Sequence, residues 1–193
     1  MTPLKMALFL FALSAVAIAF SYQGMPDGVL EASLASVYGE EVRVLWQSVP
    51  IKAAQKETLR KNFKGKKEIP DSIVVGWIPR EDHYHYLILD EAPGKIEKFL
   101  YAVYLDQTGV IVDVDVLVYR EDYGGEIDFP AFRRQFRGKK EPREVVFGRS
   151  IQNITGATIS VRSITYGVRD ILVLHEAVLE SLLPPPPPGR VDN

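Results

Sequence analysis

The stretch FLYAVYLDQTGVIVDVDVLVY (residues 99–119) predicts the centre of the fold, because it contains two strand-like runs joined by a tight turn. Both runs are rich in aromatic and β-branched residues, and the turn Asp-Gln-Thr-Gly (106–109) ends in glycine, as many hairpin turns do. In the second run, valine occupies every even position from 112 to 118 and alternates with Asp113, Asp115 and Leu117. Successive side chains of a strand point to opposite faces, so we expect one buried face and one largely solvated face that carries the two aspartates.

Helical segments are predicted on both sides of this hairpin. Apolar residues recur mostly at helical spacing over 26–47, and residues 52–68 continue helically before the chain frays near Gly65. After the hairpin, the apolar residues of 161–182 follow the i, i+3, i+4, i+7 pattern of a long helix, which stops at the prolines of 184–188.

Two shorter strands are predicted before the hairpin, at 73–78 and 84–89, because both runs are rich in aliphatic and aromatic residues. Together these elements indicate an α+β fold, a small antiparallel sheet packed with N-terminal and C-terminal helices. Along the chain, we assign 23–70 to an N-terminal helical region, 71–183 to the sheet and its long helix, and 184–193 to a proline-rich tail.

The first 22 residues (1–22) are predicted to be a signal peptide or a membrane anchor. Residues 6–20 (MALFLFALSAVAIAF) are apolar or small throughout and follow Lys5, which is typical of a secretory signal, and Ala17 and Ala19 suit a signal peptidase. Extended to residue 22, the same run reaches the short limit of a membrane-spanning helix, so cleavage and retention both stay open. Either outcome places the rest of the chain outside the cytoplasm, in the periplasm or at the cell surface.

The composition excludes several classes of function. Without cysteine, the chain has no thiol nucleophile, disulfide or cysteine-ligated metal. The 23 Lys and Arg residues nearly balance the 25 Asp and Glu residues, which argues against a general nucleic-acid-binding protein.

His83 and His85 have the spacing of residues that share one strand face, so the pair could hold a metal. With only His175 to join them, we favour a solvated strand end and predict no metal centre.

The residues directly before the last helix can carry chemistry. Residues 153–160 (NITGATIS) bring small hydroxyl side chains and a glycine to the start of an apolar periodic run. One interpretation is an ordinary N-cap, in which a hydroxyl accepts a hydrogen bond from a backbone N–H. The other is an anion site, because the start of a helix stabilises a phosphate carried on a hydroxyl such as that of Thr158. Arg162 would then lie on the same helix face and pair with the phosphate.

The order Thr-Gly-Ala-Thr at 155–158 resembles the Ser/Thr-Gly-Ala-Thr motif of the FMN-binding domain family. That family occurs in the flavin-carrying subunits of sodium-translocating NADH:quinone reductase and of Rnf-type electron-transport complexes. Residues 104–118 are similar to the family's strand–turn–strand, and residues 132–139 to the segment that follows its flavin loop. The resemblance implies that 71–183 is an FMN-binding domain.

The resemblance also implies a specific flavin site. Thr158 matches the residue to which a flavin transferase attaches FMN, taken from FAD, through a phosphoester bond. The segment from Glu121 to Glu126 stands where the family has its flavin loop, with Asp122-Tyr123 in place of the usual Thr-Pro. Its glycines allow the backbone to approach the flavin ring, and Tyr123 can pack against the ring. The implied cofactor-binding residues are Thr158, Thr155, Gly156, Ala157, Arg162, Glu121, Tyr123, Gly124 and Gly125.

These inferences predict an exported or membrane-anchored flavoprotein electron carrier without catalytic residues of its own. The flavin would supply the redox chemistry and the protein its orientation and electrostatics. Its expected partners are a flavin transferase for maturation and membrane or exported redox proteins, and not nucleic acid.

Two alternative functions stay open. Gln152, where the family motif usually has Asp, is compatible with a degenerate domain that serves as a non-redox scaffold or binding module. A reductase acting on a small substrate would need a pocket beside the ring.

Overall fold

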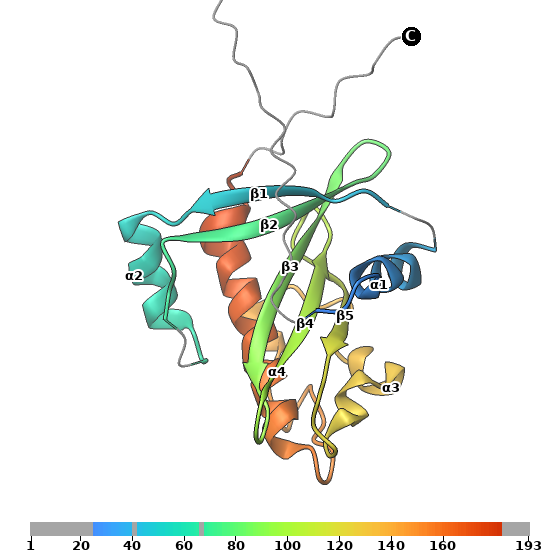
Figure 1. Ribbon diagram of the computed structural model, residues 1–193. Coiled ribbons are helices and arrows are strands. Elements are labelled where there is room, and N and C mark those ends of the chain that lie inside the picture. The colour runs from blue at the N-terminus through green and yellow to red at the C-terminus, as the bar shows by residue number, and fades with distance from the viewer. Residues whose placement is uncertain (1–24, 40–41, 66–67, 183–193) are drawn as a thin grey trace, which may run out of the picture.

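One five-stranded antiparallel sheet forms the centre of the protein (Figure 1). The computed structural model describes residues 25–39, 42–65 and 68–182. Neighbouring strands follow one another in the chain, so the sheet is a meander in the order β1-β2-β3-β4-β5. The strands are β1 (Leu45–Pro50), β2 (Ser72–Pro79), β3 (Tyr84–Pro93), β4 (Lys98–Leu105) and β5 (Ile111–Val118).

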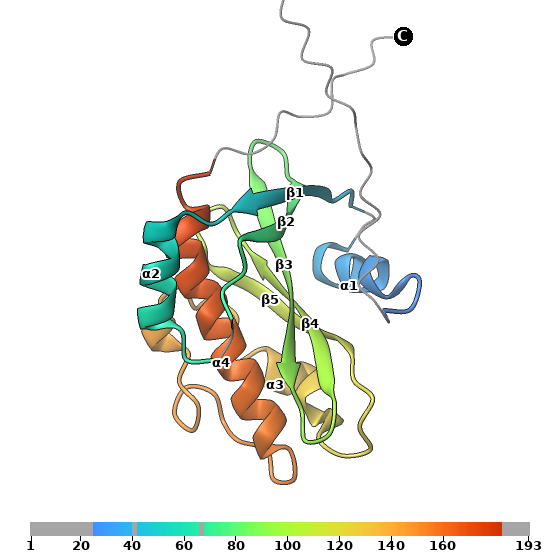
Figure 2. The same ribbon diagram turned by 60° about the vertical axis from the view of Figure 1, so that its left-hand side comes forward.

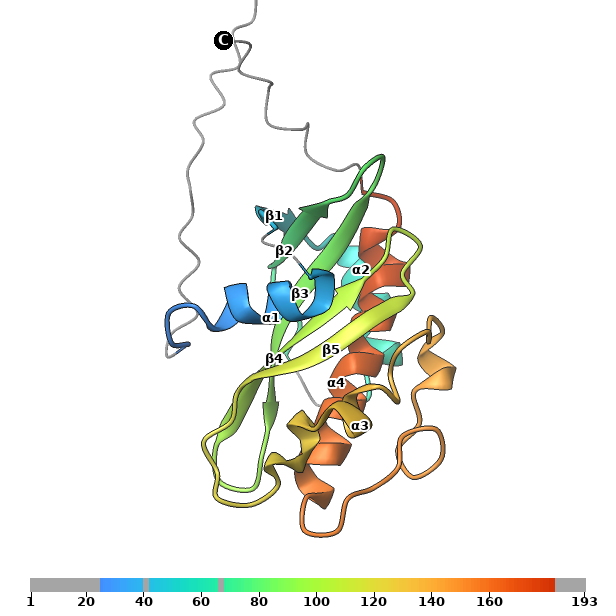
Figure 3. The same cartoon turned by 90° about the vertical axis from the view of Figure 1, so that its right-hand side faces the viewer.

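Helices cover both faces of this sheet, with α1 on one side and α4 and α2 on the other (Figure 3). Figure 2 shows α2 beside α4, the long helix near the C-terminus. The predicted α+β class, an antiparallel sheet packed with helices from both ends of the chain, is confirmed. The helices are α1 (Val29–Tyr38), α2 (Ala53–Asn62), η1 (Gly125–Asp128), α3 (Pro130–Arg133), η2 (Pro142–Glu144), α4 (Thr158–Leu174) and η3 (His175–Leu179), a π-helical turn.

The predicted export or anchor segment, 1–22, and the proline-rich tail, 184–193, lie outside the described residues. Within the ranges that are described, no helix combines the length and the apolar composition needed to cross a bilayer. The location of the protein outside the cytoplasm therefore stays a prediction.

The predicted hairpin at 99–119 is confirmed as β4 and β5. Gly109 ends its turn with φ +87°, a left-handed conformation that residues with a side chain rarely adopt. Asp106 stabilises the same turn, because its Oδ1 accepts hydrogen bonds from the N–H groups of Thr108, at 2.8 Å, and Val110, at 3.0 Å. The local sequence is therefore sufficient to specify this turn.

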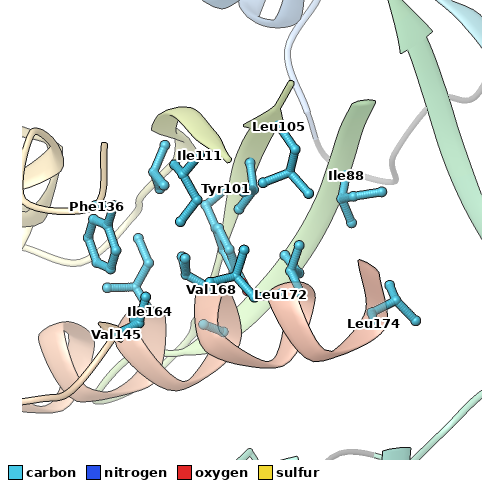
Figure 4. Close-up of a cluster of buried hydrophobic side chains, with 14 of the residues drawn as sticks. Ile88, Tyr101, Leu105, Ile111, Phe136, Val145, Ile164, Val168, Leu172 and Leu174 are labelled. Carbon is cyan, nitrogen blue, oxygen red and sulfur yellow. The ribbon is translucent and has the colours of Figure 1, made fainter. Parts of the chain in front are cut away.

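Helix α4 packs its apolar side across the sheet and forms the larger hydrophobic core. Val161, Ile164, Val168 and Leu172 are fully buried, as their helical spacing predicts. Figure 4 shows Val168 and Leu172 pointing from α4 toward Tyr101 on β4. Burial of an aliphatic side chain of this size stabilises a fold by about 1.5–3 kcal/mol. This packing fixes where the first residue of α4 lies relative to the sheet.

The second face of the sheet is also buried, because α1 covers it. Leu34 of α1 packs with Leu87 and Leu100. Beside them, Ser33 Oγ lies 2.6 Å from Tyr104 Oη in a buried hydrogen bond. The sheet therefore has a core on each face.

This second core makes the prediction of a solvated aspartate face wrong. Asp113 is only 5% exposed, and its carboxylate receives two hydrogen bonds from the Arg137 guanidinium, Nε to Oδ1 at 3.0 Å and Nη2 to Oδ2 at 2.6 Å. Asp115 forms an ion pair with Arg133. The alternation of valine and aspartate cannot reveal this, because the arginines approach from a segment that follows the hairpin in the chain.

The prediction of one helical stretch over 26–47 is also wrong in its second half. Helix α1 ends before Gly39, and residues 45–50 form strand β1, which pairs with β2. From Val42 onward the pattern has a period of two. Val44 and Trp46 pack against the core under α1, whereas Leu45 and Val49 pack against the core under α4. The region 23–70 is therefore not purely helical. The helix expected within 52–68 is confirmed as α2, which ends before Gly65, where the sequence predicts fraying.

An Asp113→Asn variant should lose about 1.5–3 kcal/mol of unfolding free energy, because it removes a charge-assisted pair from a buried site. Urea unfolding followed by far-UV circular dichroism measures this loss. Asp27→Asn, at an exposed carboxylate, is the control and should change the free energy by less than about 0.5 kcal/mol. Equal effects of the two substitutions would contradict the structural role of Asp113.

The histidine after α4 is buried against the hairpin turn. His175 is 3% exposed, and its Nε2 has no hydrogen-bond partner among the described residues. Its ring packs edge-on against Tyr86 and against the backbone of Gly109, where a Cβ atom would come within 2.5 Å of Nδ1. Burial lowers the pKa of His175; nearby Glu180 and Asp106 oppose that shift and Lys140 adds to it. The folded protein therefore keeps this imidazole neutral at pH values where an exposed histidine is protonated.

This burial predicts a loss of stability in acid. The unfolded chain takes up a proton on His175 as the pH falls through about 6.5, whereas the folded chain resists it, so stability is lost below that pH. A His175→Gln variant should lack this contribution, worth at most about 1.4 kcal/mol per pH unit for one proton. Unfolding free energies from pH 8 to 5 test this. An unchanged slope between pH 7 and 5 in the variant would contradict it. Both proteins keep the contribution of His85, whose pKa burial also lowers.

Candidate functional site

No side chain among residues 25–39, 42–65 and 68–182 caps the start of helix α4. Ala157 is the N-cap residue, and the first intrahelical hydrogen bond runs from Val161 N to Ala157 O, at 2.9 Å. The backbone N–H groups of Thr158, Ile159 and Ser160 therefore have no intrahelical acceptor. The interpretation of residues 153–160 as an ordinary hydroxyl N-cap is wrong. The helix start keeps its capacity to bind an anion.

A pocket of about 460 Å³ opens at this helix start. Its volume falls within the range of about 300–1,000 Å³ that is usual for ligand sites. Three separate segments build it: the turn between β3 and β4, the loop after β5, and the first turn of α4. The lining residues are Lys95, Glu121, Tyr123, Gly156, Ala157, Thr158, Ile159 and Ser160.

Thr158 lines this pocket and carries a hydroxyl group. Thr158 is half-buried, and its Oγ1 accepts a hydrogen bond from Asn153 Nδ2 at 3.0 Å. Gly156, two residues earlier, has φ +90° and open space where a Cβ would stand. The segment that leads into α4 therefore has a constrained backbone at Gly156, but the space beside it is open to a ligand.

Tyr119 ties the loop after β5 to the helix start. Its hydroxyl donates to the carbonyl of Tyr123 at 2.7 Å and lies 3.0 Å from Oγ of the buried Ser160. Because the tyrosine proton is used on that carbonyl, Ser160 is the donor to Tyr119. Burial raises the pKa of Tyr119, which keeps the phenol protonated as a donor.

Glu121 stabilises the β3–β4 turn. One carboxylate oxygen accepts hydrogen bonds from the backbone N–H groups of Ile96, at 2.8 Å, and Glu97, at 3.0 Å. These bonds lower the pKa of Glu121, so the side chain is held as a carboxylate. Its role in the structure is to hold the turn that carries Lys95, the cationic side chain of the pocket.

Exposed apolar side chains surround the pocket. Tyr123 is 78% exposed and Ile159 is 50% exposed, and both line it. Ile96, next to Lys95, is 84% exposed. Scattered single apolar residues on a surface need no explanation, but three around one pocket favour a partly apolar ligand.

The structure brings together some of the residues predicted for the site and separates others. Thr158, Gly156, Ala157, Glu121 and Tyr123 line the pocket. Gly124 lies behind it, where a Cβ atom would come within 3.6 Å of Ala157 Cα.

Besides Gly124, three predicted residues do not line the pocket. Thr155 is exposed, and Gly125 opens η1. The Arg162 guanidinium lies over the Phe147 ring, 5.1 Å from its centroid, instead of reaching the helix start. The spacing of Arg162 from Thr158 places it on the same helix face, but the aromatic ring of a distant segment determines where its side chain lies.

Sequence reasoning misses three residues of this region. Lys95 follows Gly94 in a turn without a motif, and only the fold places it by the helix. Tyr119 falls at the end of a predicted strand, and Asn153 in the flexible approach to α4. Gln152, the departure from the motif, donates its side-chain amide to the carbonyl of Arg149 at 2.8 Å and does not line the pocket.

The fold and this pocket define a domain whose long helix begins at a pocket with one cationic side chain, Lys95, and an apolar rim. Residues 94–173 match the family described as the FMN-binding domain, and this segment belongs to that family. The match begins at the β3–β4 turn and ends within α4, so it contains all the pocket residues.

A solved structure with a similar fold is known. The chain is similar to the crystal structure of one subunit of the Na⁺-translocating NADH-quinone reductase of Parabacteroides distasonis, with a TM-score of 0.52 and 14% sequence identity. The similarity covers 79% of this chain and 85% of that one. A search of the curated proteins found no match.

A Gly124→Ala variant should be less stable than Gly156→Ala. Both glycines have positive φ, 91° and 90°, so each alanine carries about 1–3 kcal/mol of backbone strain. Only at Gly124 does the new methyl group also meet other atoms, with Tyr119 Oη at 2.5 Å. The midpoints of urea unfolding compare the two. Equal midpoints would show that the close packing of loop and helix at Gly124 contributes nothing to stability.

Proposed function

We propose that the protein is a flavoprotein electron carrier whose FMN is attached to Thr158 by a phosphoester bond. The observation that carries the proposal is the position of the Thr158 hydroxyl. It stands at the uncapped start of α4, in a pocket that Lys95 also lines. The family of residues 94–173 supports FMN as the ligand.

The charges at the pocket fit the phosphate of FMN. The free N–H groups at the start of α4 and the helix dipole together favour an anion, by about 0.3–1 kcal/mol at an exposed site. Lys95 adds a full positive charge. A phosphate on Thr158 Oγ1 would therefore be stabilised from two directions.

The apolar surface fits the other half of the cofactor. Tyr123 and Ile159 offer an aromatic face and an aliphatic side chain to the isoalloxazine ring, and Ile96 extends that surface. When bound, the flavin supplies the electron-transfer chemistry. The side chains of this chain bind and orient it, and we assign no catalytic acid, base or nucleophile to them.

Attachment would be a group transfer from FAD. The Thr158 oxygen forms a bond to the phosphorus atom of the FMN half, the diphosphate bond of FAD breaks, AMP leaves, and the hydroxyl proton is lost. Asn153 holds the hydroxyl by donating to Oγ1; this bond occupies one of the two oxygen lone pairs and leaves the other for the attack. A separate flavin transferase is the expected catalyst and the first partner of the chain.

The electron partners are proposed by analogy. The similar structure is named as a subunit of a sodium-translocating NADH-quinone reductase. For this chain we propose redox partners that are membrane-bound or exported, reached through an N-terminal segment that acts as a signal or an anchor.

A non-redox scaffold is the second candidate function. It is favoured by Gln152, which replaces the usual acidic residue of the attachment motif. The side-chain amide of Gln152 donates a hydrogen bond to a backbone carbonyl of its own loop.

Thr158→Ala should abolish covalent flavin, because alanine has no oxygen to esterify. The fold should lose only about 0.5–1.5 kcal/mol, since within the described part of the chain the hydroxyl has one hydrogen bond, which it accepts from Asn153. Protein made together with a flavin transferase and FAD is tested by in-gel fluorescence under denaturing conditions and by mass spectrometry of the peptide that contains residue 158.

Two variants serve as controls for this experiment. Thr158→Ser keeps the oxygen and should retain flavin. Thr155→Ala removes a hydroxyl that does not line the pocket and should also retain it. Flavin on Thr155 would overturn the residue assignment. A wild-type protein without flavin under these conditions would favour the scaffold function.

A further inference from the structure

The turn between β2 and β3 brings two histidines together at the end of the sheet away from the flavin pocket (Figure 1). His83 lies in the turn and His85 lies on β3, and their Nε2 atoms are 3.3 Å apart. The β3–β4 turn, which carries Lys95, is at the other end of β3. A strand of 10 residues is about 33 Å long, so the two places are well separated.

The other nitrogen of each ring has its own partner. His83 Nδ1 lies 2.7 Å from Asp82 Oδ1, and His85 Nδ1 lies 3.1 Å from Tyr38 Oη on α1. These contacts orient both rings so that their Nε2 atoms face each other. A metal-binding histidine usually donates the N–H of its far nitrogen to a carboxylate, a backbone carbonyl or water, and Asp82 is such a carboxylate for His83.

Without a metal, one proton joins the two rings. The consistent set of donors is Tyr38 O–H to His85 Nδ1, His85 Nε2–H to His83 Nε2, and His83 Nδ1–H to the Asp82 carboxylate. Every polar atom of this chain of hydrogen bonds is then satisfied. A metal ion held by both Nε2 atoms would replace this shared proton.

The spacing of the two nitrogens fits a tetrahedral metal. Zinc binds imidazole nitrogen at about 2.0–2.1 Å, so two ligands of a tetrahedral ion are about 3.3–3.4 Å apart. We propose that His83 and His85 form a two-imidazole site for a divalent transition metal of the Zn²⁺, Ni²⁺ and Cu²⁺ class, held through both Nε2 atoms. Neutral imidazole suits these metals and not Mg²⁺ or Ca²⁺.

Metal binding needs only a change of tautomer. The proton of His85 leaves Nε2 and resides on Nδ1, from which it is donated to Tyr38 Oη, and the Tyr38 hydroxyl proton turns away. His83 keeps its proton on Nδ1, hydrogen-bonded to Asp82. A neutral pair of rings therefore binds the ion without net release of a proton.

The site is open and accessible. The His83 side chain is 32% exposed. Among the described residues, no group of three or more His, Asp or Glu side chains gathers around one point, so water or a ligand from another molecule completes the coordination. Asp82 and Asp106 bring negative charge to the pair and Arg80 positive charge, and the exposed Glu81 adds a further negative charge in the same turn.

Isothermal titration calorimetry of the full chain, free of any affinity tag and stripped with a chelator, tests the site with Zn²⁺ and Ni²⁺ separately. One ion should bind per chain. His83→Gln should weaken binding more than about tenfold, because one of only two protein ligands is lost. If wild type binds no more tightly than His83→Gln, the pair acts only as a hydrogen bond and the proposal is overturned.

A matched pair of variants in the same turn separates orientation from charge. Asp82→Asn removes the carboxylate that holds His83 and should weaken binding about 10–100-fold. Glu81→Gln removes an equal charge from an exposed neighbour and should have little effect. Equal losses would show that Asp82 acts only through its charge and would contradict its assigned part in the site.

Nuclear magnetic resonance of the imidazole protons shows which histidines are involved. Ni²⁺ should broaden the signals of His83 and His85 and leave those of His175 sharp. Broadening of His175 instead would overturn the assignment. Thr158→Ala should bind Zn²⁺ like wild type, so a failure of the flavin proposal leaves this result unaffected.

Discussion

The packing of α4 against the sheet is the contact on which the rest of the structure depends. Val161, Ile164, Val168 and Leu172 are removed from water together, and each contributes about 1.5–3 kcal/mol. Because the core is closely packed, the helix cannot slide along the sheet without opening cavities. Its first residue, Thr158, is therefore held beside the β3–β4 turn.

Once the helix start is held there, two short polar networks complete the pocket. Tyr119 and Ser160 join the loop after β5 to α4, and Glu121 joins the same loop to the turn that carries Lys95. Neither network provides a redox-active group. Their consequence is preorganisation: a phosphate attached at the helix start would meet a cation and an apolar surface already in place.

The sheet separates two regions of different chemistry. At one end of β3 are the uncapped helix start and Lys95, which favour an anion. At the other end are two imidazoles whose lone pairs suit a cation. Helix α1 contributes to the second region through Tyr38 and covers the sheet face that carries Asp113. The N-terminal part of the chain, which lies outside the family match, therefore extends the FMN-binding domain with a second core and a second candidate site.

The sequence by itself was sufficient for features set by local periodicity and local turn chemistry. The β4–β5 hairpin, with Asp106 and Gly109 at its turn, and the apolar stripe of α4 could be read directly, because neighbouring residues decide both. The Thr-Gly-Ala-Thr motif likewise indicated the family that residues 94–173 match. Only the tertiary structure decided which charged and polar groups meet. Asp113 is buried because Arg137 arrives from a later segment, Arg162 stacks on Phe147, and Lys95 joins the pocket across a turn. Such partners are distant in sequence, and their meeting depends on how whole elements pack, which no local pattern encodes.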